Sequence, residues 1–306
     1  MILRGKITQY GPQNRATLFA PGNPTERHSK TDLVVDYKKS RTIKNCYPFY
    51  LEEKKSQMLT LAYRKQKCDT IYEQRMGAHI YRDKGPIIKN ARRPYAFLYS
   101  WKTNNGRRPT VLLELLGIDY YLHQVDLDLK VQKEDWYLKK NANGKIPTLA
   151  WVDEKGDITY INESAAILLF LADKYDKSRN FSFRPGSKEY YLQLEWLFFE
   201  LSGFCPYKSN WRFFHNLPER NETAVSRFRD ESIRCLKVLE TRLNKTGTGY
   251  LVGDHLSLAD ITLYTWIRPS QMDTYEEVIE SLPNIKNWIL RIGNIPEIKK
   301  GLAVFD

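Results

Sequence analysis

Long hydrophobic runs and cysteine pairs are both missing from the sequence. No stretch reaches the roughly 18 consecutive apolar residues that a membrane-spanning helix needs, so such a helix is excluded. The cysteines lie far apart and form no Cys-x-x-Cys pair: Cys46, Cys68, Cys205 and Cys235. This spacing argues against a disulfide scaffold and against a zinc ribbon. Free thiols in a reducing compartment are the default expectation.

Positive charge is concentrated in one part of the chain. Residues 1–90 contain 18 Lys and Arg against 8 Asp and Glu, whereas residues 91–306 contain 30 against 28. The formal net charge of +12 therefore does not indicate nucleic-acid binding by the whole protein. Within residues 1–90, basic residues are interleaved with Tyr and Phe. A solvated arm and a segment that contacts RNA or an acidic membrane are both open interpretations.

The first 90 residues also lack a sustained apolar pattern. Gly11-Pro12 and Pro21-Gly22-Asn23-Pro24 are dense turn signals that favour an irregular arm, and residues 51–76 carry only a weak helical pattern. Basic residues precede the first acid, Glu26, as in a mitochondrial transit peptide, but the prolines interrupt any long amphipathic helix. We expect a basic, largely irregular extension over residues 1–90. A cytoplasmic location is expected, with mitochondria as the alternative.

From residue 95 onward the pattern becomes regular. It predicts strands over residues 95–101, 120–127, 148–152 and 158–160, and helices over residues 108–116, 134–139 and 163–175. In chain order this is β-α-β-α-β-β-α within about 80 residues, which is the order of a thioredoxin-like domain. We assign this domain to residues 91–176.

The remainder of the chain has helical periodicity. Residues 177–188 form a polar linker, after which Leu194, Leu197 and Leu201 recur at helical spacing. Similar patterns cover residues 227–243, 258–266 and 285–292. The expected fold is therefore an α/β thioredoxin-like domain followed by an all-α domain over residues 189–306.

Four short motifs lie in these two domains. They are Thr103-Asn104-Asn105-Gly106 after the first strand, Asn143-Gly144-Lys145-Ile146-Pro147-Thr148, Asn162-Glu163-Ser164-Ala165-Ala166-Ile167, and Ser257-Leu258-Ala259-Asp260 in the helical half. In order and spacing they resemble the glutathione transferase family. The resemblance is closest to the nu-class bacterial enzymes and the fungal disulfide-reductase-type proteins, which include the fungal nitrogen regulator. It covers residues 95–306 and implies the glutathione transferase fold.

The first motif resembles the Thr-Pro-Asn-Gly turn of nu-class proteins, in which the Asn side chain lies near the glutathione sulfur. The resemblance implies that Asn105 takes this catalytic place near the glutathione sulfur, with Thr103 as a second hydrogen-bond donor. Hydrogen-bond donors and a helix N-terminus stabilise a thiolate, which is the reactive form of a thiol. Asn104 departs from the usual Pro. Tyr99 and Ser100 are the alternatives at the sulfur, and no Cys lies here to support a covalent cysteine mechanism.

The next two motifs imply contacts with the rest of glutathione. Pro147 matches the family's cis-proline, so the backbone of Ile146 would pair with the cysteinyl part of the ligand. Lys145 would meet a glutathione carboxylate. Ser164 and the amides of its helix N-terminus would bind the γ-glutamyl carboxylate, and Glu163 would bind the ammonium group.

Other matches are weaker or structural. Gln132 matches a glutamine that contacts glutathione, and Arg227 matches an arginine that reaches across in nu-class proteins. Ser257 and Asp260 resemble the family's helix-capping motif, which we assign to folding. The aromatic stretch Phe204–Phe214 is predicted to supply an apolar pocket beside the thiol.

The resemblance implies an enzyme. Bound glutathione thiolate, as co-substrate and without a metal, would reduce a disulfide or peroxide or attack an apolar electrophile. A non-catalytic regulatory or interaction protein is the alternative, because a fold does not by itself decide function. Since proteins of this fold commonly pair, a homodimer is expected.

Overall fold

A computed structural model describes residues 73–75, 77–272 and 275–306. The predictions for residues 1–72, including most of the weak helical pattern and the contacts of the basic arm, lie outside this range. Cys46 and Cys68 also lie outside it. Within the described residues, no helix combines the length and the apolar character that a bilayer crossing requires.

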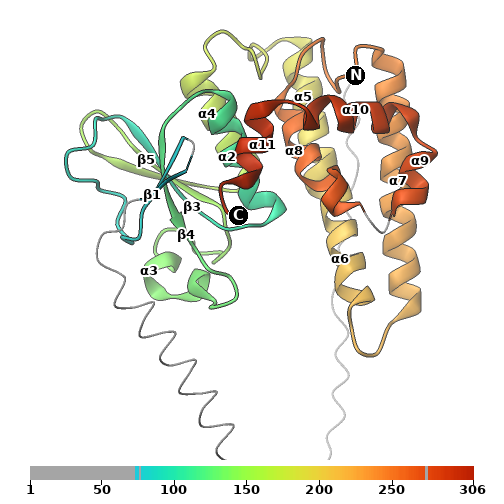
Figure 1. Cartoon of the computed structure of the whole chain (residues 1–306), viewed down its shortest axis with the longest axis horizontal. Coiled ribbons are helices and arrows are strands. Elements are labelled where there is room, and N and C mark those ends of the chain that lie inside the picture. Colours follow the sequence, from blue (N-terminus) through green and yellow to red (C-terminus); the bar gives the residue numbers. More distant parts are fainter. Residues whose placement is uncertain (1–72, 76, 273–274) are drawn as a thin grey trace, which may run out of the picture. The chain divides into compact units, whose positions relative to one another are not determined.

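A six-stranded mixed sheet forms the first domain (Figure 1). Its strands are β1 (Glu73–Arg75), β2 (Ala78–Ile80), β3 (Tyr95–Ser100), β4 (Tyr120–Gln124), β5 (Thr148–Val152) and β6 (Ile158–Asn162). Their spatial order is β1-β2-β4-β3-β5-β6. Strand β3 pairs in parallel with β4 and antiparallel with β5, and β5 pairs antiparallel with β6. The four predicted strands are therefore neighbours.

Side chains of β3 alternate between two hydrophobic cores. Ala96 and Leu98 face a core shared with α2 (Asn104–Leu115) and α4 (Ser164–Tyr175), whereas Phe97 and Tyr99 face a second core. The second core is covered by η1 (Val131–Lys133) and α3 (Asp135–Leu138). Burial on both faces explains why β3 is apolar or aromatic from Tyr95 to Tyr99 instead of alternating with polar residues. The predicted β-α-β-α-β-β-α order is present.

The sheet begins earlier in the chain than the sequence indicated. Strands β1 and β2 form a hairpin, and β2 pairs in parallel with β4 so that fully buried Ala78 lies opposite Tyr120. Further along, the Tyr95 hydroxyl donates to the Pro86 carbonyl and accepts from the Ile88 N–H, both at 2.9 Å. Residues 77–90 thus belong to the sheet domain, not to an irregular extension. Strands of three residues are too short to show an alternating pattern.

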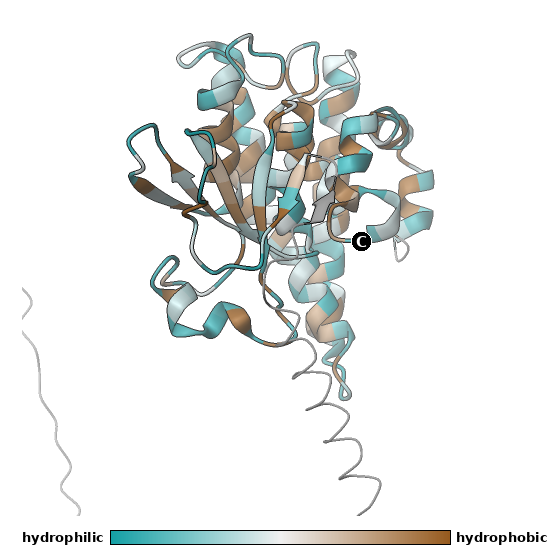
Figure 2. Ribbon diagram, turned by 60° about the vertical axis from the view of Figure 1, so that its left-hand side comes forward, coloured by the Kyte–Doolittle hydropathy of each residue, from teal (hydrophilic) through white to brown (hydrophobic). Residues whose placement is uncertain are grey.

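The second domain is helical, as predicted. Its elements are α5 (Lys188–Phe199), η2 (Glu200–Phe204), α6 (Cys205–His215), α7 (Glu222–Thr246), α8 (Leu258–Ile267), η3 (Pro269–Gln271), α9 (Glu276–Glu280), α10 (Pro283–Gly293) and α11 (Pro296–Ala303). Helices α5 and α6 are joined through η2, a single π-helical turn. Hydrophobic residues gather in the strands and along one side of the helices (Figure 2), which is the distribution that amphipathic elements around a core require.

The predicted capping motif begins α8. The Asp260 carboxylate is fully buried and accepts four hydrogen bonds, from the Ser257 N–H (3.0 Å), the Ser257 hydroxyl (2.7 Å), the Leu251 N–H (3.0 Å) and Trp288 Nε1 (2.9 Å). These partners come from the preceding loop and from α10, so Asp260 joins three segments as well as capping one helix.

Helix α11 holds α2 in place. A side chain at Gly301 would put its Cβ 2.4 Å from the Val111 Cα, so glycine is needed for this close approach. Thr110 donates to the Gly301 carbonyl at 2.7 Å, and Arg107 forms an ion pair with Asp306 at 2.8 Å. The C-terminus of the chain thus fixes the helix whose N-terminus forms the candidate site.

Candidate functional site

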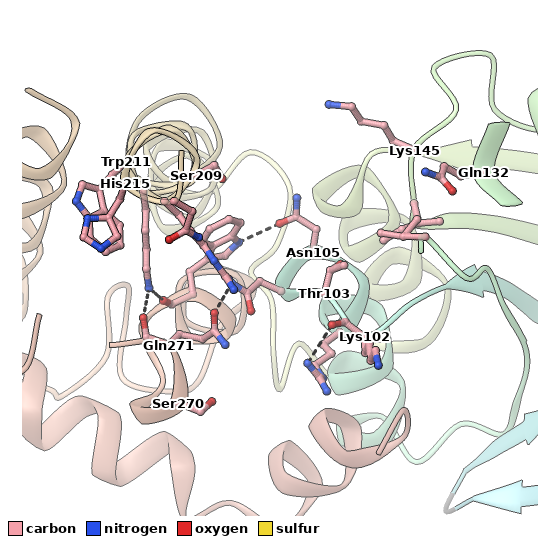
Figure 3. Close-up of a pocket in the computed structure, with 18 of the residues that line it drawn as sticks. Lys102, Thr103, Asn105, Gln132, Lys145, Ser209, Trp211, His215, Ser270 and Gln271 are labelled. Atoms are coloured by element: carbon pink, nitrogen blue, oxygen red, sulfur yellow. Dashed lines mark hydrogen bonds between the residues drawn. The ribbon is translucent and has the colours of Figure 1, made fainter. Parts of the chain in front are cut away.

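A cavity of about 960 Å³ lies between the sheet domain and the helical domain. It is walled by the start of α2, by η1 and the loop before β5, by α6, and by the end of α8 with η3. Figure 3 shows Gln132 and Lys145 on one side, Trp211 and His215 on the other, and Asn105 between them.

The first turn of α2 brings Thr103 and Asn105 to the cavity. Thr103 is the N-cap, and its hydroxyl oxygen accepts from the Gly106 N–H at 2.9 Å, which leaves its own O–H able to donate. A Cβ at Gly106 would lie 2.2 Å from the Trp101 carbonyl oxygen, so only glycine lets α2 start this close to β3. The Thr-Asn-Asn-Gly turn therefore positions both predicted donors.

Three side chains of the helical domain hold this turn. The Trp266 indole donates from Nε1 to Asn105 Oδ1 at 2.9 Å. Asn104 donates to Gln271 Oε1 at 3.1 Å and accepts from Arg268 at 3.2 Å. Asn104 stands where the nu-class pattern has Pro, and here its side chain connects α2 to the segment after α8.

Lys208 connects α6 to the same segment. Its ammonium group donates to the Trp266 carbonyl at 2.7 Å and to the Gln271 carbonyl at 2.5 Å, and the side chain is 6% exposed. A buried ammonium is tolerated when its donors are satisfied in this way. The positions of Trp266 and Gln271, both of which hold the α2 turn, are thereby fixed from α6.

The two alternative sulfur-site residues do not reach the cavity. Tyr99 is fully buried and donates from its hydroxyl to the Lys84 carbonyl at 2.9 Å. Ser100 is also fully buried and donates to the Gly106 carbonyl at 2.9 Å. Both serve packing or local structure, which leaves Asn105 and Thr103 as the candidates.

Cys205 lies at the start of α6, close to the Asn105 side chain. Burial raises the pKa of the Cys205 thiol to about 11, and the charge of Glu200 acts in the same direction. Hydrogen bonds from Ser209 and Asn105 and the charge of Arg108 oppose this shift without cancelling it. The thiol therefore stays protonated at neutral pH and is a poor nucleophile.

The opposite wall contains Gln132, Lys145 and Ile146. The Ile146–Pro147 peptide bond is cis, as predicted. Among the described residues, the backbone N–H and C=O of Ile146 form no hydrogen bond with other backbone groups, and the buried Gln132 Oε1 has no partner. Unpaired groups of this kind beside a cavity are available to a ligand.

Glu163 and Ser164 mark the start of α4 but are not part of the cavity lining. Glu163 is exposed and has φ +68°, an unusual conformation for a non-glycine residue. Ser164 is buried, and its hydroxyl oxygen accepts from Arg108 Nη1 at 2.8 Å. The Ser164 O–H is therefore turned away from Arg108 and can donate to another group.

Arg108 and Glu200 form a fully buried ion pair behind Ser164, at 2.5 Å. Burial raises the pKa of Glu200 to about 7, although the Arg108 guanidinium opposes the shift. The pair links α2 to the π-helical turn between α5 and α6. Arg108, whose charge is balanced by Glu200, also donates to the Ser164 oxygen and so sets the orientation of the Ser164 hydroxyl.

Other sequence predictions fall outside the cavity. Arg227 is exposed on α7 and does not line it. Of the aromatic residues in Phe204–Phe214, only Trp211 lines it, since Phe204 is buried in the core, Phe213 is 61% exposed, and Phe214 stacks on Phe228. This part of the cavity wall is thus less apolar than the sequence predicted.

Several important residues carried no local sequence signal. Trp266 and Arg108 lie within helices whose neighbours are core residues, and their partners are distant in the chain. Lys208 did have a local signal, because a lysine inside a run of aromatic residues is a candidate for burial. In the described part of the chain, no cluster of His, Cys, Asp and Glu could hold a metal ion.

Comparisons with known proteins agree with this geometry. Family models match as glutathione S-transferase N-terminal domain over residues 104–174 and C-terminal domain over residues 208–303. The glutathione S-transferase-like protein tpcF of Aspergillus fumigatus is 34% identical over 211 residues, covering 64% of this chain and 90% of the relative. The disulfide-bond oxidoreductase YfcG of Escherichia coli is 31% identical over 210 residues, covering 67% of this chain and 93% of the relative.

A solved structure is similar as well. It is a glutathione transferase homolog from Lodderomyces elongisporus with two glutathione molecules per subunit. The identity is 32% and the TM-score 0.65, over 69% of this chain and 98% of that one. The predicted fold is confirmed, and the oxidoreductase relative agrees with the predicted disulfide-reductase-type branch. The chain belongs to the glutathione S-transferase family.

Proposed function

We propose that this protein is an enzyme that binds glutathione as a thiolate and uses it to reduce organic disulfides. The observation that carries the proposal is that separate segments bring five of the residues expected to meet glutathione to one cavity: Thr103, Asn105, Gln132, Lys145 and Ile146. The relatives support it, because one is named a disulfide-bond oxidoreductase and a similar structure contains glutathione.

In this proposal the sulfur of glutathione lies at the start of α2. The Asn105 amide and the Thr103 hydroxyl donate to it, and the helix N-terminus adds a favourable potential. Together they lower the pKa of the bound thiol. Because the Cys205 thiol stays protonated, bound glutathione and not Cys205 is the nucleophile.

The rest of glutathione extends along the sheet-domain wall. The free backbone groups of Ile146 pair with the cysteinyl unit, Gln132 Oε1 accepts from a ligand N–H, and Lys145 binds the glycine carboxylate. The γ-glutamyl end is directed to the N-terminus of α4. There the Ser164 hydroxyl donates to its carboxylate and Glu163 accepts from its ammonium group.

The chemistry balances with glutathione alone as reductant. The glutathione thiolate attacks one sulfur of the disulfide RS–SR, the S–S bond breaks, and RS⁻ leaves and is protonated. A second glutathione thiolate then attacks the glutathionyl sulfur of the mixed disulfide and expels the second RS⁻. Two glutathione molecules are oxidised to glutathione disulfide, and one disulfide is reduced to two thiols.

The test compares glutathione-dependent reduction of 2-hydroxyethyl disulfide by the full chain and by Asn105→Ala. Loss of one donor to a developing or bound anion should lower kcat/KM about 100-fold. Asn244→Ala is a matched control, because Asn244 is exposed on α7 away from the cavity, and it should retain wild-type activity. Glutathione binding without turnover of disulfides, peroxides or electrophiles would support the non-catalytic alternative.

We also propose that the protein forms a homodimer. Tyr191 and Phe198 lie seven residues apart on α5 and are each 62% exposed, so two large aromatic side chains share one helix face. Light scattering should give twice the chain mass for the wild type and the single-chain mass for Phe198→Glu. A dimer that persists in the variant would exclude this face.

A further inference from the structure

The cavity has two halves with different lining. On the sheet-domain side lie Gln132, Lys145 and Ile146, which the proposed function assigns to glutathione. Across Asn105, the wall is formed by α6 and η3, and Figure 3 shows Ser209, Trp211 and His215 there. A group that reacts with a sulfur bound at Asn105 must therefore occupy the α6 half.

Basic residues line the cavity on both sides. Six Lys and Arg side chains line the whole cavity, and among the residues that the structure describes no Asp or Glu does so. Helix α6 contains no acidic residue at all. Any substituent of the second substrate therefore enters a region of positive potential.

Most of these cations already have partners or belong to the glutathione side. Arg107 is paired with Asp306, and Lys208 is held by two backbone carbonyls. Lys102, Lys133 and Lys145 belong to the sheet domain, where they lie just before α2, on η1 and in the loop before β5. Arg212 is different, since its side chain is exposed on α6 and forms no hydrogen bond or ion pair with any other described residue.

The surroundings of Arg212 fit a polar, planar group. On the same helix and in the same cavity wall, the Trp211 and His215 rings stack on each other, with centroids 5.0 Å apart and an interplanar angle of 26°. Ser209, Asn216 and Ser270 add further polar side chains to the same half. A guanidinium group without a partner binds a carboxylate through two parallel hydrogen bonds.

We infer that the second substrate is an organic anion and that Arg212 selects it by binding its carboxylate. The inference rests on the proposed function, in which the partner of glutathione enters from the α6 side. For a disulfide, the preferred substrate carries a carboxylate on the thiol that leaves first. The bond changes are those already described, and Arg212 exchanges no proton or electron.

A series of three disulfides tests the inference. The dianion 3,3′-dithiodipropionate, neutral 2-hydroxyethyl disulfide and the dication cystamine are compared, each kcat/KM being divided by the uncatalysed rate constant with glutathione. We expect the dianion to exceed the neutral compound by about tenfold, the effect of one charge-assisted pair, and cystamine to be the poorest. Raising the salt concentration should reduce the preference.

Variants then locate the preference. Arg212→Gln should reduce the ratio of dianion to neutral disulfide about tenfold. Arg184→Gln removes the same charge from an exposed position outside the cavity and should keep the wild-type ratio. A wild-type ratio near one, or a ratio that Arg212→Gln leaves unchanged, would overturn the inference.

A binding measurement separates failure of the inference from failure of the proposed function. Calorimetry compares S-butylglutathione with S-(3-carboxypropyl)glutathione, which places a carboxylate in the α6 half whether or not turnover occurs. Tighter binding of the carboxylate form that disappears in Arg212→Gln supports the inference. Equal binding of both overturns it and leaves glutathione binding intact. Absence of binding by both overturns the proposed function and the inference with it.

Discussion

Trp266 fixes the direction of the Asn105 amide. Its indole Nε1 donates to Asn105 Oδ1 at 2.9 Å, and an indole N–H can only donate. The amide oxygen must therefore face Trp266, and the NH2 group must face the other way. A residue of the helical domain thus decides that Asn105 presents a donor at the proposed sulfur position.

Replacing Trp266 by Phe should release this amide. We expect the pKa of the bound glutathione thiol to rise and kcat/KM to fall about three- to tenfold, because one orienting hydrogen bond is lost. Ultraviolet absorbance of the thiolate against pH measures the first effect. Trp196→Phe is the matched control, since in the described structure its buried Nε1 has no hydrogen-bond partner. An unchanged thiol pKa in Trp266→Phe would contradict the orienting role.

Asn105→Asp should be less active than Asn105→Ala. Trp266 can still donate to one carboxylate oxygen, which directs the other oxygen at the sulfur. A negative charge there disfavours a thiolate through like-charge repulsion. We expect kcat/KM at pH 7 at least about tenfold below that of the alanine variant. Activity of Asn105→Asp at or above the alanine level would place the sulfur elsewhere.

The buried Arg108–Glu200 pair should make stability depend on pH. Burial raises the pKa of Glu200 to about 7, whereas an exposed glutamate has a pKa of about 4.3. Between these values the folded state binds more protons than the unfolded state, so the free energy of unfolding falls as pH rises from about 4.3 towards 7. Denaturant unfolding at several pH values should show this pH dependence of the free energy of unfolding in the wild type and its loss in Glu200→Gln. The same pH dependence in both proteins would refute a contribution from Glu200.

Removing Arg108 should be more damaging than removing the pair. Arg108→Met leaves Glu200 buried without a partner, at a cost of about 3–5 kcal/mol in unfolding free energy. The double variant Arg108→Met with Glu200→Leu should recover much of this loss. Since Arg108 also orients Ser164, the double variant should still bind glutathione more weakly than the wild type does. Full recovery of affinity in calorimetry would show that Ser164 needs no support from Arg108.

Asp260→Ala should destabilise the fold far more than Ser257→Ala. The aspartate variant leaves buried donors of Ser257, Leu251 and Trp288 without an acceptor, which should cost at least about 3 kcal/mol. Loss of the serine hydroxyl alone should cost about 1 kcal/mol, as for an ordinary N-cap. Chemical denaturation of both variants measures the difference, and equal losses would mean that Asp260 acts only as a cap.

Local patterns predicted most of the secondary structure correctly. The aromatic and apolar run of β3 and the helical periodicity of α7 are contained in consecutive residues, and so are the turn chemistry at Gly106 and the cap at Ser257. The short β1–β2 hairpin was missed, because its stability comes from pairing with β4 and not from its own three-residue strands.

The amino-acid sequence alone determined the two-domain fold and the turn that carries Thr103 and Asn105, because helix periods, strand alternation and capping motifs act over a few neighbouring residues. The tertiary structure decided which way the Asn105 amide points, that Ser100 and Tyr99 are buried, and that Arg212 faces the cavity without a partner. The direction of the amide depends on Trp266, which lies 161 positions from Asn105 in the chain. The burial of Ser100 and Tyr99 depends on the layers packed on the two faces of the sheet, and no local pattern encodes such packing.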